Sequence, residues 1–534
     1  MKRSFFLLPE IAKNVKIYYM KTAVKKVKPS FWGSQNSLLL LIILAVVIFS
    51  FGIAFLSPLK ALSLLVGLGF LFVAFYDPKY IVLFLAIYTP FEPFLLKFIP
   101  DEIYFYSRYT LEGLIYVLLI SVGTHLLLRR NKLLATPIDW PFAVFLFICF
   151  ASIVINLVPW QIGFLGVRQI IRFILLFYIV ANLGLDKKFI KKIIYLLFAI
   201  VLVEVSIGYL QAIIGSAADQ FLLPSRQRFL SGFQITTSIE RLGEAGVRIF
   251  ATLGRYDQLG TFLVFFLLLI VGLLYEIKNL KEKKILFALL LFSLPVLILT
   301  YSRASWFGFL LGFLLIGLAI KRNKYILYSL ICFVLLMVSY VFYSDIIVSR
   351  LADQPRPSVV ERFFEAFSYE RWRGEYLGYG RLYFIVKTPT VVVKHSPLFG
   401  VGPGQYGGGA VTALHNVTKY DELGLPFGVY GTEGYIDNNW LSLWGETGTF
   451  GLLAYLAIFG MLGKFAYRSY KKSEDEFSRG LALGFLGCLL ALAFQAFLGT
   501  YLEVRTIALY FWLFGGIIVW QGSREYRQAK TKNI

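Results

Sequence analysis

Residues 257–324 read DQLGTFLVFFLLLIVGLLYEIKNLKEKKILFALLLFSLPVLILTYSRASWFGFLLGFLLIGLAIKRNK. Three apolar runs, at 257–275, 285–301 and 304–320, are separated by the basic segment KNLKEKK at 278–284 and by a short polar turn. A helix needs about 20 apolar residues to cross a hydrocarbon core of about 30 Å, because each residue advances it by about 1.5 Å. The pattern therefore predicts three membrane-spanning helices in succession.

The remainder of the chain has the same character. Of its 534 residues, 58% are hydrophobic and 16% are charged, and the mean hydropathy is +0.71. Soluble domains are less apolar and more charged, so lipid must cover much of this surface. We predict an all-α polytopic membrane protein with about fourteen transmembrane helices. The predicted spans lie near residues 37–56, 59–76, 80–97, 110–128, 140–159, 166–183, 190–213, 257–275, 285–301, 304–320, 325–343, 440–463, 480–499 and 506–521.

Lysine and arginine concentrate in alternate short loops, which is the pattern of cytoplasmic loops under the positive-inside rule. With the N-terminus placed in the cytoplasm, these basic segments all fall on the cytoplasmic side, so we predict that both termini lie there. The net charge of +22 is then explained without a nucleic-acid partner. The predicted cytoplasmic basic segments are 129–132, 187–192, 278–284, 321–324, 468–472 and 524–532.

Two predicted outside loops are large, near residues 215–256 and 344–437. The second is far longer than ordinary loops, so we expect a folded functional cap. The predicted division of the chain is a basic cytoplasmic segment at 1–36, a first transmembrane part at 37–343, the large extracytoplasmic loop at 344–437, C-terminal transmembrane helices at 438–521 and a cytoplasmic tail at 522–534.

The chain contains no pattern of metal ligands. Its three cysteines lie inside apolar runs without CxxC spacing, and its three histidines are far apart in the sequence. Structural and catalytic zinc sites need several such ligands at close, regular spacings. We therefore predict no metal and no cofactor.

Arginines in short outside loops depart from the positive-inside pattern. A guanidinium group forms two parallel hydrogen bonds that match phosphate or carboxylate oxygens. A group of outside arginines therefore predicts a diphosphate, sulfate or carboxylate ligand, and the alternative is that each anchors its helix at the membrane interface. The arginines placed in this way are Arg248, Arg255, Arg303 and Arg381.

Four further residues stand where the outside loops meet the membrane. Arg168 and Arg172 share one helix face, where they either contact an anionic lipid headgroup or extend to the interface. Asp437 lies where the large loop enters a span, so it is either a functional carboxylate or the N-cap of that helix. Glu446 lies about two turns inside the membrane, where a carboxylate either functions or pairs with an arginine.

Three stretches resemble sequence elements of the O-antigen ligase and polymerase superfamily. TYSRASW at 300–306 resembles the family's Ser-Arg-x-x-Trp/Leu element, and HSPLFGVGPG at 395–404 resembles its HPLLGVGPG element. DNNWL at 437–441, with ETG at 446–448, resembles its HNxYL…ETG element. Residues 248–260 resemble a further element, R…GtfxNPN, without its proline and asparagines. The resemblance covers roughly residues 245–465.

The resemblance implies a bacterial inner-membrane glycosyltransferase with a helical bundle like that of the GT-C class. Such enzymes transfer a glycan from undecaprenyl diphosphate to an acceptor hydroxyl on the outer face of the membrane, with inversion and without metal or nucleotide. Arg248 and Arg303 are then expected to stabilise the charge that develops on the diphosphate. The expected supporting residues are Arg168, Arg172, Arg255, Arg381, His395, His415 and Glu446.

The acceptor's proton must pass to a base, for which we expect Asp437. Family ligases have histidine at this position. A free aspartate ionises near pH 3.9 and a histidine near pH 6.5, so the two bases differ in strength. His415, which is followed by asparagine, is the alternative base, and His395 is read first as structural.

The difference at Asp437 favours a polymerase, whose acceptor is a second lipid-linked repeat unit, over a ligase, whose acceptor is lipid A-core. Both readings imply a lipid-linked oligosaccharide, an acceptor glycan and membrane lipids as partners. A transporter would need matched halves with broken helices near the midplane, and we find no such repeat. A structural scaffold would not need arginines on the outer side.

Overall fold

The computed structural model describes residues 55–128, 133–224, 229–230, 233–234, 248–328, 369–431 and 434–532, with isolated positions near 46–52 and 330–335. The chain divides into two compact units, residues 1–70 and residues 71–534. The first unit contributes the beginning of helix α3 to the described residues, and all other helices named below belong to the second unit.

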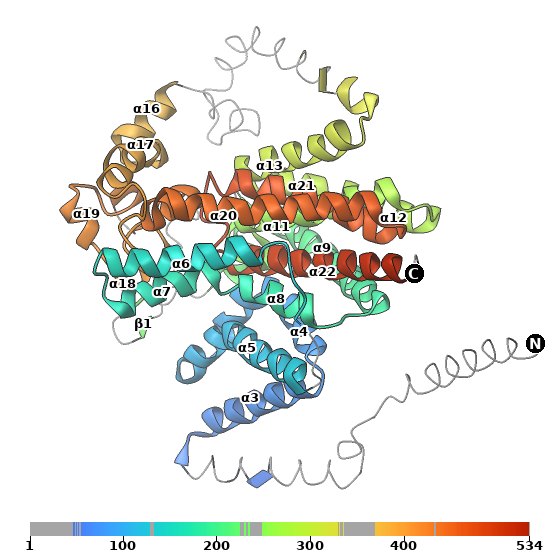
Figure 1. The fold of residues 1–534 in the computed structure, drawn as a ribbon, viewed down its shortest axis with the longest axis horizontal. Helices are drawn as coiled ribbons and strands as arrows, with labels where there is room; N and C mark the ends of the chain where they lie inside the picture. Colours follow the sequence, from blue (N-terminus) through green and yellow to red (C-terminus); the bar gives the residue numbers. More distant parts are fainter. Residues whose placement is uncertain are drawn as a thin grey trace, which may run out of the picture. The chain divides into compact units, whose positions relative to one another are not determined.

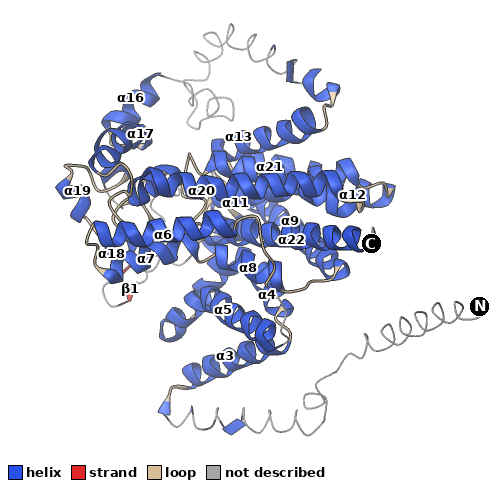
Figure 2. Ribbon diagram, in the orientation of Figure 1, coloured by secondary structure: helices blue, strands red, loops and turns tan. Residues whose placement is uncertain are grey.

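The described residues are mostly helical, with one antiparallel pair of two-residue strands (Figure 2). The elements are α3 (Pro58–Tyr76), α4 (Lys79–Leu95), η1 (Leu96–Phe98), α5 (Asp101–Leu128), α6 (Asp139–Ile155), α7 (Trp160–Ile171), α8 (Ile174–Asn182), α9 (Lys187–Ile214), α10 (Ser216–Leu222), β1 (Phe229–Leu230), β2 (Phe233–Gln234), η3 (Ala251–Leu253), α11 (Tyr256–Glu276), α12 (Leu280–Leu299), α13 (Arg303–Leu314), η4 (Leu315–Ile320), α16 (Tyr369–Leu377), α17 (Arg381–Lys387), η5 (Thr388–Val393), α18 (Gly409–Leu414), α19 (Thr418–Glu422), η6 (Val429–Gly431), α20 (Asn439–Lys472), α21 (Glu476–Gln495) and α22 (Arg505–Lys532).

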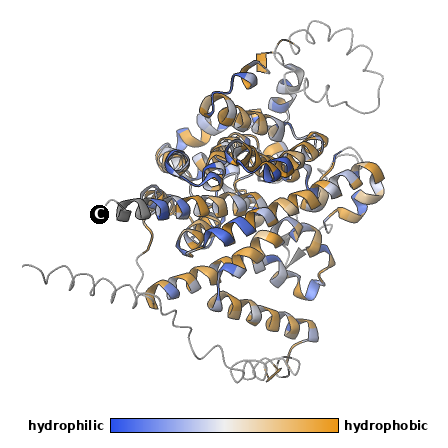
Figure 3. Cartoon of the chain, turned by 90° about the vertical axis from the view of Figure 1, so that its right-hand side faces the viewer, coloured by the Kyte–Doolittle hydropathy of each residue, from blue (hydrophilic) through white to orange (hydrophobic). Residues whose placement is uncertain are grey.

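Nine helices in the described part of the chain are long and apolar enough to cross a membrane. Their predominantly apolar composition is visible in Figure 3. An all-α polytopic membrane protein is therefore confirmed. The nine candidate spans are α3, α4 with η1, α5, α9, α11, α13 with η4, α20, α21 and the first part of α22, and each coincides with a predicted span.

The other five predicted spans differ in form or lie outside the described residues. The span near 166–183 is a pair of helices, α7 and α8, bent by 51°. The span near 140–159 is the 17-residue helix α6, and the span near 285–301 is α12, which begins with the polar sequence LKEKK. The spans near 37–56 and 325–343 fall mostly outside the described residues, so the count of fourteen stays a prediction.

Helix α11 is the buried centre of the second unit. Its residues 259–273 are all buried, and all of them except Thr261 are apolar, as expected of a helix that is surrounded by protein. It packs against α21 through glycines: a Cβ added at Gly272 would lie 2.2 Å from the backbone nitrogen of Gly484. Gly480 and Gly484 have the small-xxx-small spacing that lets two helix backbones approach closely. Figure 1 shows α11, α20 and α22 running through the same region of the bundle.

Residues 381–441 fold around an apolar core of their own. Phe384, Tyr406 and Tyr420 are completely buried in it. The Tyr406 and Tyr420 rings stack at 5.5 Å, and the Tyr406 hydroxyl is hydrogen-bonded to that of Thr388 at 2.8 Å. This core holds the start of α17 and the segment before α20 in fixed positions.

Helix α20 begins with a side-chain cap. The Asn438 side chain accepts a hydrogen bond from the Leu441 amide at 3.0 Å. The alternative that Asp437 is the N-cap is therefore wrong, because the next residue satisfies the exposed amide at the first turn. The Asp437 carboxylate is left to interact elsewhere.

The glycine contact between α11 and α21 predicts an asymmetry between two helical glycines. Gly484→Ala places a methyl group within 3 Å of backbone atoms of α11 and should destabilise the protein by about 1–3 kcal/mol. Gly460→Ala, on the exposed side of α20 with no atom within 4 Å, should be neutral or slightly stabilising. Thermal unfolding midpoints in detergent compare the two variants. Equal midpoints would show that the backbone contact is not needed.

Candidate functional site

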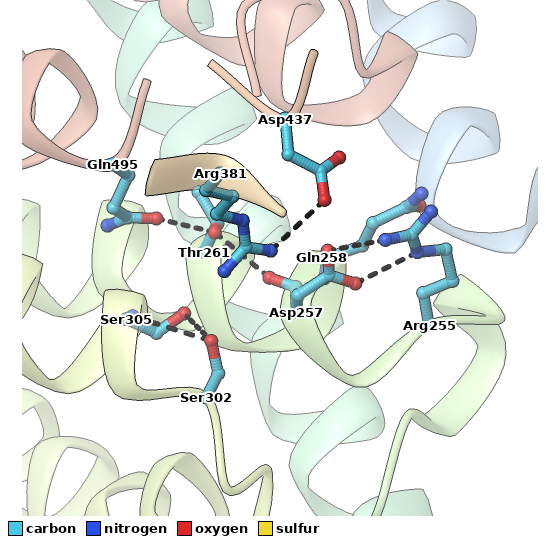
Figure 4. A network of polar contacts seen from close by, with 9 residues as sticks. All are labelled: Arg255, Asp257, Gln258, Thr261, Ser302, Ser305, Arg381, Asp437 and Gln495. Carbon is cyan, nitrogen blue, oxygen red and sulfur yellow. Dashed lines mark hydrogen bonds and ion pairs between the residues drawn. The ribbon is translucent and has the colours of Figure 1, made fainter. Parts of the chain in front are cut away.

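Three segments far apart in sequence bring charged side chains together at the start of α11 (Figure 4). Arg255 and Asp257 come from the beginning of α11, Arg381 is the first residue of α17, and Asp437 directly precedes the cap of α20. The Arg381 guanidinium donates to an Asp437 carboxylate oxygen at 3.2 Å. Arg255 donates two hydrogen bonds to Asp257, of 3.1 and 2.9 Å. We call these four residues the Asp437 cluster.

The cluster is accessible from outside the protein. The Arg381 and Arg255 side chains are 44% and 49% exposed, whereas Asp437 and Asp257 are 19% and 16% exposed. The charge of Asp257 raises the pKa of Arg255 above its ordinary value, although partial burial opposes the shift. Burial lowers the pKa of Arg381, but the charge of Asp437 together with smaller contributions from Tyr501, Glu375 and Tyr256 outweighs it, so that the net shift is upward. Both arginines are therefore firmly cationic.

Arg248 and two tyrosines border the Asp437 cluster. The Arg248 guanidinium lies over the Tyr256 ring, 4.3 Å from its centre. Tyr501, in the loop between α21 and α22, is 5% exposed. Burial and the charge of Asp257 raise the pKa of Tyr501, while Arg381 and Arg255 act in the opposite direction. The Tyr501 phenol therefore stays protonated and keeps a hydroxyl proton among these charges.

Arg303 begins α13, which starts beside the first turns of α11. Ser302 caps this helix by accepting a hydrogen bond from the Ser305 amide, and the two hydroxyls lie 2.8 Å apart. A Cβ added at Gly260 of α11 would lie 2.4 Å from the Ser305 hydroxyl, so the two helices touch here. Figure 4 shows Ser302 and Ser305 near the end of α11 that carries Asp257. Arg303 is thus positioned at the edge of the same region.

The HSPLFGVGPG and ETG elements form one backbone unit. Helix α20 is interrupted at Gly448, whose φ of 69° and ψ of −173° suit only glycine. The amides of Thr449 and Phe450 then donate to the carbonyls of Pro397 and Leu398, at 3.0 and 3.2 Å. A Cβ at Gly400 would collide with the α20 backbone at 2.5 Å. These two motifs fix how the large loop attaches to α20.

Glu446 serves this attachment. Its carboxylate accepts a hydrogen bond from the Gly404 amide at 2.9 Å, and its backbone carbonyl accepts from the Gly402 amide at 2.9 Å. The side chain is 3% exposed. The structure places Glu446 inside the loop attachment and not in the Asp437 cluster.

Arg168 and Arg172 lie in a second, separate polar group. Both form ion pairs with Glu112 of α5, with shortest distances of 2.9 and 3.5 Å. Arg172 also donates to the backbone carbonyl of Glu503 at 3.2 Å. The sequence analysis considered pairing between a carboxylate and an arginine only for Glu446. In the structure, it is Arg168 and Arg172 that form such pairs, with Glu112.

The Glu503 carboxylate joins three elements in this second group. It accepts hydrogen bonds from the Gly409 amide at 2.8 Å, from Gln169 at 3.1 Å and from Asn439 at 3.3 Å. Burial raises the pKa of Glu503, and the Gly409 and Gln169 hydrogen bonds act in the opposite direction. Asn439 follows Asp437 by two residues, and Tyr501 precedes Glu503 by two. Through its hydrogen bond to Asn439, Glu503 therefore connects the segment that carries Tyr501 to the start of α20 beside Asp437.

The two loop histidines lie apart from the cluster. The His395 ring is 3.9 Å from a Glu422 oxygen and is 49% exposed. His415 ends α18 in a left-handed conformation, with φ of 48°, and its ring packs on Phe427 with centres 4.7 Å apart. Neither histidine is joined to Asp437 by a contact among the described residues.

Sequence reasoning did not single out Asp257 or Tyr501. Asp257 follows Arg255 by two residues, a spacing that lets a residue at a helix start pair with one in the first turn, so the sequence held a usable signal. The sequence held no such signal for Tyr501. Nothing in GTYLEV at 499–504 indicates that this tyrosine lies near Arg381, which is more than 60 residues away in the chain. The described residues contain no group of three or more His, Cys, Asp or Glu side chains placed to hold a metal ion.

The contact of Glu446 with Gly404 predicts a difference between two substitutions. Glu446→Ala removes the acceptor of a buried amide and should cost about 1–3 kcal/mol of stability. Glu446→Gln retains a carbonyl oxygen there and should unfold near the wild-type temperature. Glu422→Ala, which breaks an exposed pair with Lys419, is the control and should change little. An unfolding temperature for Glu446→Gln as low as that for Glu446→Ala would mean that the charge matters and not the acceptor.

No curated protein matches the chain significantly. A family model described as O-Antigen ligase matches residues 287–456, less than half of the chain. The matched range contains Arg303, Arg381 and Asp437 together with the 395–404 and 446–448 elements. The resemblance to the O-antigen ligase/polymerase superfamily is therefore confirmed over residues 287–456, and the match supports a glycosyltransferase-like function for this membrane protein.

Proposed function

We propose that the Asp437 cluster is the active site of a glycosyltransferase that takes its glycan from a polyprenyl diphosphate. The observation that carries the proposal is the grouping of Arg255 and Arg381 with Asp437 at the start of α11 (Figure 4). Arg248 lies over the ring of Tyr256 in the same turn, and Arg303 begins the neighbouring helix α13. A diphosphate leaving group gains negative charge as its bond to the sugar breaks. Arginines already in position stabilise that charge without having to reorganise.

In the proposed reaction, an acceptor hydroxyl oxygen attacks the anomeric carbon. The carbon–oxygen bond to the diphosphate breaks, and the polyprenyl diphosphate leaves with the electron pair. The hydroxyl proton passes to the Asp437 carboxylate, which is the only change of charge on the protein. A single displacement of this kind inverts the anomeric carbon, in keeping with the inversion that the family resemblance implies.

Because Arg381 is paired with Asp437, binding of the donor diphosphate to Arg381 would release the Asp437 carboxylate oxygen from the ion pair. The pair occupies one oxygen of Asp437, and a diphosphate offers Arg381 several alternative acceptor oxygens. Donor binding would draw Arg381 away from this oxygen, which could then accept the acceptor's proton. The partial exposure of both side chains keeps the cost of this exchange low.

The position of the cluster along α11 supports an outer-face site. Asp257 lies in the first turn of α11, and Glu276 ends the helix about 30 Å away, since 21 residues advance it by about 1.5 Å each. Directly after Glu276 comes the basic segment 278–284, which the positive-inside rule assigns to the cytoplasm. The Asp437 cluster would then face the outside, where the glycan carrier presents its sugar.

We favour a polymerase over a ligase because the family's histidine is replaced by Asp437. Purified protein in lipid, given an undecaprenyl-diphosphate-linked repeat unit as both donor and acceptor, should form a ladder of products on a gel. Transfer only after lipid A-core is added would instead make the protein a ligase. No product with either acceptor, from folded protein and verified donor, would count against the enzyme proposal.

Asp437→Asn should lower the transfer rate by about 10²–10⁴-fold, because the amide keeps the shape of the side chain and cannot accept the proton. The rate is measured as product formed per minute at saturating donor. Asp421→Asn changes an exposed aspartate of the same loop region and should leave the rate unchanged. Full activity of the Asp437→Asn variant would exclude Asp437 as the base.

Arg255→Gln and Arg381→Gln should each lower kcat/KM for the donor by about 10²–10³-fold. Each substitution removes a positive charge that would stabilise the negative charge developing on the leaving diphosphate. Steady-state kinetics with varied donor measure the effect, and Arg373→Gln, on the exposed surface of α16, is the matched control. A loss confined to the acceptor's KM would place these arginines at the acceptor and contradict the diphosphate assignment.

A further inference from the structure

An apolar groove lies at the end of α11 that is opposite to the Asp437 cluster. It has a volume of about 510 Å³ and is lined by side chains of α11, α12 and α13, among them Leu274, Phe287 and Phe313. Two lysines of α12, Lys283 and Lys284, also line it. Phe287 is 52% exposed, so the groove is open along its side.

Three nearby basic residues form ion pairs that the groove lysines lack among the described residues, and Lys281 of the same helix also has none there. Lys191 contacts Glu282 at 3.2 Å, Lys278 contacts Glu476 at 3.1 Å, and Lys321 forms an ion pair with Glu276. Within the described ranges, no carboxylate forms an ion pair with Lys283 or Lys284. Their ammonium groups are therefore available to an anion from outside the chain.

An apolar groove with two cations at its rim matches the two parts of an anionic phospholipid. The volume falls within the range of about 300–1,000 Å³ that is usual for small-molecule sites. Basic pockets between transmembrane helices on the cytoplasmic side are a known setting for anionic headgroups. A zwitterionic headgroup fits less well, because it carries its own cation beside the phosphate.

We propose that this groove binds one anionic phospholipid, with an acyl chain along Leu274, Phe287 and Phe313 and the phosphate on Lys283 and Lys284. The site does not depend on the proposed glycosyl transfer, because about 20–25 Å of α11 separates it from the Asp437 cluster. Lipid bound only by the folded protein stabilises the folded state. The lipid would thereby secure the end of the helix whose other end carries Arg255 and Asp257.

The test is native mass spectrometry of the purified full chain after exchange into equal amounts of phosphatidylglycerol and phosphatidylcholine. We expect one retained phosphatidylglycerol in preference to phosphatidylcholine. The double variant Lys283→Gln/Lys284→Gln should lower that retention by about 30-fold, since each lysine contributes about 1 kcal/mol near a lipid phosphate. Lys281→Gln, on the same helix but not in the groove lining, should retain the lipid.

A second pair of variants tests the acyl-chain part with both lysines intact. Leu274→Trp fills the groove and should also abolish retention, whereas Leu291→Trp, 51% exposed on α12 and outside the lining, should not. Equal loss in Lys281→Gln and the double variant would show that the lysines only attract bulk headgroups, and would overturn the proposal. Equal retention of phosphatidylcholine, or wild-type protein without retained lipid, would overturn it as well.

Discussion

The close packing of α11 inside the bundle is the constraint on which the rest of the second unit depends. A transmembrane helix surrounded by protein gains nothing from lipid contact, so its position must come from the fit of its neighbours. Gly272 of α11 and the glycines of α21 bring the two backbones to within contact distance. Both ends of α11 are fixed as a result. One end carries Asp257, and the other ends in Glu276, which accepts from Lys321 and Arg479.

Charges are placed in two ways in this bundle, and the difference is one of exposure. Arg172 and Glu112 are 7% and 8% exposed, and removing either partner would leave an uncompensated buried charge, at a typical cost of about 3–5 kcal/mol. Arg381 and Asp437 are far more accessible, and pairs of that kind contribute little to stability. The first arrangement suits a fixed structural joint. The second suits a pair that a substrate's oxygens can separate.

Two of the family elements in this chain have a structural role in joining the large loop to α20. The glycines of HSPLFGVGPG and ETG allow backbone contacts between the large loop and α20, and Glu446 completes them by accepting the Gly404 amide. Arg381 lies outside these elements, yet it contacts Asp437 directly. A residue at a candidate active site need not stand in the motif that identifies it.

The sequence alone determined the class of the protein, nine of its spans and the identity of several charged residues at the candidate site. Apolar length and loop charge are local properties of the chain, which is why they could be read without a structure. Three features needed the tertiary structure: the bend between α7 and α8, the pairing of Arg168 and Arg172 with Glu112, and the approach of Arg381 to Asp437 and of Tyr501 to Arg381. Each of these features depends on how distant segments pack against one another, or on the angle at which two helices meet. Composition and spacing say which helices form, but not which of their faces meet.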